Sequence, residues 1–70
     1  MEHLSAKTLL IIKVTEIIAS KYNLSISDAR DILYSSCLVE LIDDDETGLY
    51  GESPLYIFSL FEQLTNKPNN

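Results

Sequence analysis

Five acidic side chains lie close together in the second half of the chain, and carboxylate oxygens are the groups that bind calcium. They are Asp43, Asp44, Asp45, Glu46 and Glu52, with Thr47-Gly48 between the last two. Counted from Asp43, the ligand spacing matches the first half of an EF-hand loop, but its twelfth position is Pro54 instead of a bidentate glutamate. Glu52 comes two places too early to replace it. We therefore predict a solvated acidic turn without a metal, and weak metal binding by residues 43–52 remains an alternative.

The single cysteine and the single histidine are the other residues that could carry chemistry. Cys37 and His3 could form a nucleophile and base, but such a pair needs a third group that orients the base. No such group stands in a recognisable context, and a lone cysteine is usually a small buried apolar residue. Gly48 and Gly51 lack the pattern and the lysine of a phosphate-binding loop. We expect no enzymatic activity and no cofactor.

Two tyrosines are candidates for contacts with another protein. Tyr50 follows Leu49 in the predicted turn, and Tyr56 lies on the less apolar side of the last predicted helix. An exposed tyrosine offers a large apolar area and few rotatable bonds, which suits a binding anchor. A small core also needs large side chains, so Leu49 and Tyr50 could instead fold back against its base. Both interpretations remain open at this stage.

Length and charge limit the function classes. A chain of 70 residues, 46% of them hydrophobic, forms one small domain with little stability to spare, and one cysteine allows no internal disulfide. A second copy of the chain is a natural source of further stabilisation. The net charge is −6, with +1 in residues 1–30 and −7 in residues 31–70. Such a chain repels nucleic acid, and its acidic half either attracts a basic protein or only keeps the domain in solution.

The sequence pattern predicts four helices that hold these residues in place, over residues 5–22, 26–35, 37–43 and 54–64. They predict an all-α, small orthogonal bundle within one domain, 1–65, followed by a frayed polar tail, 66–70. Segment 37–42 could also be extended, although a lone strand has no pairing partner in this chain. Ser5, Ser25 or Ser27, and Ser53 before Pro54 are the predicted helix caps. Gly48 and Gly51 are expected where φ is positive.

The predicted first helix carries more apolar surface than one packing contact requires. Its main stripe consists of Leu10, Ile11, Val14, Ile17 and Ile18. Leu9, Ile12 and Ala19 fall outside this stripe, so we predict that they form an interface. In the later helices the predicted core residues are Ala29, Ile32, Leu33, Ile57, Leu60, Phe61 and Leu64, with Phe58 at the margin.

The segment from Leu41 to Pro54, with Ala29 and Leu33-Tyr34-Ser35-Ser36 upstream, resembles a family of short bacterial proteins of unknown function. The run Glu-Thr-Gly-Leu-Tyr followed by Glu-Ser-Pro carries most of this likeness. Members are regarded as small helical proteins, some encoded beside toxin genes. The resemblance implies an antitoxin-like or accessory role and supplies no catalytic residues.

These observations together predict a small interaction module that self-associates or docks on another protein. An antitoxin-like protein that binds a basic partner is the first alternative. No secretory signal and no apolar run long enough to span a bilayer is visible, so we expect a cytoplasmic protein that does not enter the membrane.

Overall fold

The computed structural model describes residues 5–65 as an assembly of helices. They are α1 (Ala6–Tyr22), α2 (Ile26–Ser35), α3 (Leu38–Asp43), the short 3-10 turns η1 (Asp45–Thr47) and η2 (Leu49–Gly51), and α4 (Pro54–Thr65). No strand occurs in this part of the chain. The predicted all-α class and four helices are thus confirmed, and segment 37–42 is helical from Leu38. The predicted tail, 66–70, and His3 lie outside the described residues.

Serine side chains begin three of the four main helices. Ser5 Oγ accepts a hydrogen bond from the Thr8 amide at 3.1 Å, and Ser25 Oγ accepts one from the Asp28 amide at 3.1 Å. Ser53 Oγ does the same for the Tyr56 amide at 3.2 Å. Each bond satisfies an amide that has no partner within the first turn of its helix. Ser25, and not Ser27, is therefore the cap of α2.

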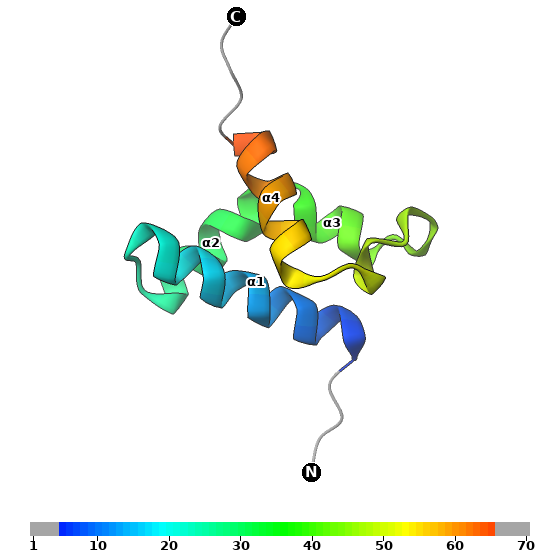
Figure 1. Cartoon of the computed structure of the whole chain (residues 1–70), viewed down its shortest axis with the longest axis horizontal. Coiled ribbons are helices and arrows are strands. Elements are labelled where there is room, and N and C mark those ends of the chain that lie inside the picture. Colours follow the sequence, from blue (N-terminus) through cyan, green and yellow to red (C-terminus); the bar gives the residue numbers. More distant parts are fainter. Residues whose placement is uncertain (1–4, 66–70) are drawn as a thin grey trace, which may run out of the picture.

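The core lies where α1 meets the other helices, and α4 rises steeply from α1 (Figure 1). α2 turns back beside α1, and the two are joined by residues 23–25 alone. Asn23 makes this reversal with a left-handed backbone, φ 57°, and the Leu24 amide bonds to Ala19 O at 2.9 Å. The core side chains are Leu10, Val14, Ile18, Ala19, Ala29, Leu33, Leu38, Ile42, Ile57, Phe58 and Phe61.

Four side chains do not lie where the sequence pattern placed them. Ala19, predicted at an interface, is buried because the chain reverses beside it at Asn23. Phe58, predicted at the margin of α4, is buried against Phe61 with ring centroids 6.2 Å apart. Ile32 and Leu64, predicted in the core, are exposed. The sequence pattern therefore located the buried faces of α2 and α4, but not which side chains at their margins are buried.

The junction between α2 and α3 explains why the lone cysteine is not buried. Ser36 Oγ donates to Leu33 O at 2.6 Å and accepts from the Leu38 amide at 3.3 Å, which ends one helix and starts the next. Cys37 lies between them with φ 51° and an exposed side chain. The left-handed conformation bends the chain and directs this residue outward, contrary to our prediction. Of the glycines, only Gly48 has a positive φ, 68°, whereas Gly51 does not, so the prediction was wrong for Gly51.

Candidate interaction site

A groove of about 320 Å³ runs between α1 and α2. Its lining consists of Thr8, Ile11, Ile12, Thr15 and Glu16 from α1 and Ile26, Arg30 and Tyr34 from α2. Three of its apolar side chains face solvent to a large degree: Ile12 is 40% exposed, Ile26 51% and Tyr34 56%. Such exposure on neighbouring helices of a small domain is typical of a surface that contacts another protein.

The helical repeat explains why these residues share one groove. Thr8, Ile12 and Glu16 follow one another at intervals of four residues along α1, so they lie in one row. Ile26, Arg30 and Tyr34 do the same along α2. The short connection at residues 23–25 makes the helices antiparallel neighbours, so the two rows become the two walls. The floor includes Thr15, which is buried and donates its hydroxyl to Ile11 O at 2.7 Å.

The walls carry one charge of each sign. Glu16 belongs to the α1 wall and Arg30 to the α2 wall, and both residues are exposed. Within residues 5–65 the ion pairs are those of Lys7 with Asp43 and Asp45. Glu16 and Arg30 therefore line the same groove without pairing with each other.

The residues predicted to form an interface are divided among separate places. Ile12 lies in the groove, and Leu9 lies three residues before it on the outer surface of α1, 41% exposed. Tyr56 is 46% exposed on α4, next to Leu55, which at 69% is the most exposed large apolar residue of positions 5–65. Ala19 is excluded by its burial. Of the predicted set, only Leu9 and Ile12 can thus contribute to one continuous surface around the groove.

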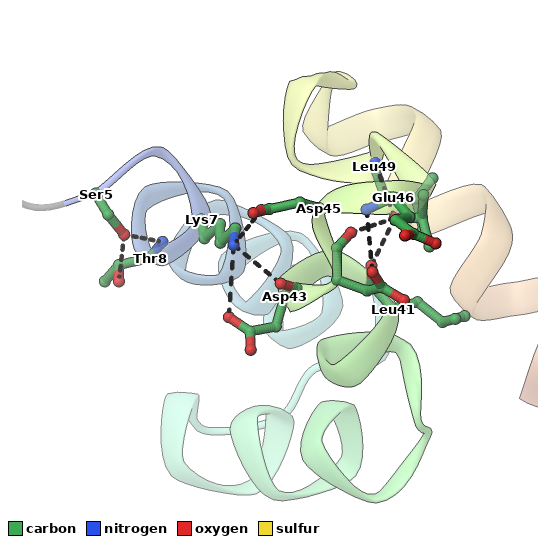
Figure 2. Close-up of polar contacts among 10 residues, drawn as sticks. Ser5, Lys7, Thr8, Leu41, Asp43, Asp45, Glu46 and Leu49 are labelled. Atoms are coloured by element: carbon green, nitrogen blue, oxygen red, sulfur yellow. Dashed lines mark hydrogen bonds and ion pairs between the residues drawn. The ribbon is translucent and has the colours of Figure 1, made fainter.

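The acidic turn is tied to α1 by one lysine (Figure 2). Lys7 Nζ lies 2.7 Å from Asp45 Oδ1 and 3.8 Å from Asp43 Oδ1, and it donates to Asp43 O at 2.9 Å. Its ammonium thus stands among the oxygens that a bound cation would need. The hydrogen bond to Asp45, helped by the attraction of both carboxylates, raises the pKa of Lys7 above its ordinary 10.5, although partial desolvation opposes it.

The remaining polar groups of the turn also serve the fold. Asp44 Oδ1 accepts from the Glu46 amide at 3.0 Å and begins η1. Thr47 Oγ1 bonds to Leu41 O at 2.7 Å, and it accepts from the Leu49 amide at 3.1 Å. Glu52 is exposed just before the cap of α4. In the described part of the chain, no three His, Cys, Asp or Glu side chains are arranged to hold a metal ion.

Leu49 and Tyr50 have different environments, although they are neighbours in η2. Leu49 is half-buried against the core, as one of our two interpretations expected. Tyr50 is 40% exposed, and Lys7 Nζ lies 5.4 Å from the centre of its ring. A cation at this distance is attracted by the ring face. Tyr50 therefore lies beside Lys7, together with Asp43 and Asp45, at the N-terminal end of α1.

No protein-family model, no curated protein and no solved structure matches this chain. The resemblance of residues 41–54 to short bacterial proteins stays an expectation from the sequence. No helix among residues 5–65 is both long and apolar enough to cross a membrane.

Sequence reasoning missed most of the groove, and a signal for it was present. Ile26, Arg30 and Tyr34 repeat every four residues along α2, as do Thr8, Ile12 and Glu16 along α1. Neither Ile26 nor Tyr34 was among the predicted interface residues. The sequence alone could have shown that each helix carries a second row of residues outside its core stripe. It could not show that the two rows lie side by side, because that depends on the turn at Asn23.

Proposed function

We propose that this protein is a non-catalytic interaction module that associates with a second copy of itself through the groove between α1 and α2. The observation that carries the proposal is the exposure of Ile12, Ile26 and Tyr34 along one groove. Leu9 extends this apolar surface along α1. The acidic turn is engaged by Lys7 within the fold, so the proposal does not depend on it.

The exposed apolar area determines the expected free energy of association between the two copies. Full burial of a large apolar side chain contributes about 1.5–3 kcal/mol, so each of these half-exposed side chains offers about 1 kcal/mol. A symmetric pair that buries Leu9, Ile12, Ile26 and Tyr34 of both copies gains about 8 kcal/mol. Loss of free rotation and translation costs about 4 kcal/mol or more. With the smallest of these costs, the remainder corresponds to a weak dimer with a Kd of roughly 1 mM, to which polar contacts across the groove would add.

Sedimentation equilibrium at concentrations from about 50 µM to 2 mM, which bracket this Kd, tests the proposal. The average mass of the wild-type protein should rise with concentration from that of one chain toward that of two. Ile12→Glu places a charge on the apolar wall and should keep the protein monomeric. Leu55→Glu is the matched control, since Leu55 is exposed on α4 outside the groove, and it should behave as wild type.

Circular dichroism should show that both variants keep their helices, because both positions are exposed. Ile26→Glu provides a second change on the opposite wall and should also prevent association. A wild-type protein that stays monomeric throughout this range contradicts the proposal. So does association that Ile12→Glu and Ile26→Glu leave intact.

A further inference from the structure

The charges in the groove between α1 and α2 are complementary to those of the same groove in a second copy of the chain. Glu16 stands on one wall and Arg30 on the other, and neither has an ion-pair partner among the described residues. In a two-fold dimer the same patch meets itself, and an axis along the groove places the acid of one wall opposite the wall of the other copy that carries the base. One acid and one base on opposite walls are therefore self-complementary.

The surrounding charge also favours a second copy on this face. Residues 5–35, which contain α1 and α2, carry four basic and three acidic side chains, a net charge of +1. The acidic residues of positions 43–52 belong to α3, η1, η2 and the loop before α4. The groove lining itself carries one acidic and one basic side chain, a net charge of zero, although each chain carries −6. A strongly basic partner would find only Glu16 as an acid in the groove lining.

A neighbouring depression is less suited to this role. It is lined by Tyr22, Leu24, Ile32, Phe61 and Thr65, without a charged side chain. Nothing there selects one occupant over another.

We propose that α1 of each copy packs on α2 of the other, so that Glu16 of one copy pairs with Arg30 of its mate, twice in each dimer. This inference rests on the proposed self-association and adds its geometry. A two-fold axis along the groove produces the arrangement, because it lays each α1 wall on the opposite α2 wall. Ile12, one turn before Glu16, then faces Tyr34 of the other copy, one turn after Arg30. The crossed charges fix which walls meet and select this chain as its own partner.

Charge-reversal substitutions at Glu16 and Arg30 test this arrangement of the two copies. Glu16→Arg places two arginines in each crossed pair, and Arg30→Glu places two glutamates there. Each single variant should weaken the dimer about tenfold or more, because attraction becomes repulsion at two places. Glu52→Arg and Lys13→Glu make the same changes in net charge outside the groove and should have much smaller effects.

The decisive step mixes the two single variants. An E16R chain and an R30E chain form one Arg–Glu pair and one native pair with each other, so their mixture should associate nearly as well as wild type. The double variant E16R/R30E should also recover. Isotope-labelled E16R, titrated with unlabelled R30E, reports the recovery through the amide shifts of groove residues and through slower translational diffusion.

The outcomes separate this inference from the proposed function. If Ile12→Glu abolishes association but the charge variants act no more strongly than their controls, the crossed pairing is wrong and self-association through the groove stands. Failure of the mixed variants to recover has the same meaning. If the wild-type protein does not associate at all, both proposals are wrong.

Discussion

At the scale of single residues, Lys7 contacts two carboxylates of the acidic turn that the sequence suggested as possible metal ligands. The acidic run from Asp43 to Glu46 was recognisable in the sequence, and its missing twelfth ligand argued against a calcium loop. Its actual partner could not be recognised, because Lys7 lies 36 residues away from Asp43 and meets it only after α1 and α3 have packed. Lys7 supplies a positive charge beside two of these carboxylates, Asp43 and Asp45.

The pH dependence of stability belongs to this scale. Tyr22 donates its hydroxyl to Glu62 Oε2 at 3.0 Å, and this hydrogen bond, with some desolvation, raises the pKa of Tyr22 above its ordinary 10.0. The pKa of Lys7 is raised above 10.5. The folded protein therefore holds both protons more tightly than the unfolded chain. The stability that each proton contributes is complete below the ordinary pKa, and it is lost as the pH rises through the raised pKa.

We thus expect the thermal midpoint to fall as the pH is raised beyond about 10, and to fall less in the double variant Lys7→Met/Tyr22→Phe. Scanning calorimetry of both proteins between about pH 8 and pH 12 measures this difference. Lys13→Met/Tyr56→Phe is the matched control, since neither of these side chains makes an ion pair or a side-chain hydrogen bond within residues 5–65, and both lie outside the groove lining. Equal alkaline losses in the three proteins would show that the contacts of Lys7 and Tyr22 do not stabilise the fold.

At the scale of helices, local signals predicted most of what the structure contains. Caps at Ser5, Ser25 and Ser53 are decided by the residues within one turn, so the sequence alone could place them. The break at Ser36, between the predicted helices 26–35 and 37–43, also lies where it was expected. Burial on the flanks of the helices was less predictable. Ile32 is exposed and Phe58 is buried, contrary to the prediction, because their burial depends on where α2 and α4 cross their neighbours.

Removal of the cap of α4 tests this local account. Ser53→Ala takes away the acceptor for the Tyr56 amide and should lower the free energy of unfolding by about 1 kcal/mol. Chemical denaturation measures the change. Ser59→Ala, in the exposed middle of α4, makes the same substitution where no cap is lost and should be neutral or slightly stabilising. Equal effects at the two positions would mean that Ser53 does not stabilise the start of the helix.

At the scale of the whole molecule, the fold class followed from the helical pattern and the short length, but the groove did not. The excess apolar surface of α1 was visible, and it correctly singled out Leu9 and Ile12 as exposed. Ala19 was wrongly included, because its burial depends on the reversal at Asn23. The other wall, with Ile26, Arg30 and Tyr34, depends on how α2 lies against α1, which is a property of the assembled helices.

The most direct measurement of the central claim detects contacts between two copies at about 1 mM, near the expected Kd. In a mixture of isotope-labelled and unlabelled protein, filtered nuclear Overhauser spectra report only protons from different copies. Our account predicts cross-peaks from the Ile12 methyl groups of one copy to the Tyr34 ring of the other. Cross-peaks from Leu55 and Tyr56 instead, or none between copies at this concentration, would contradict it.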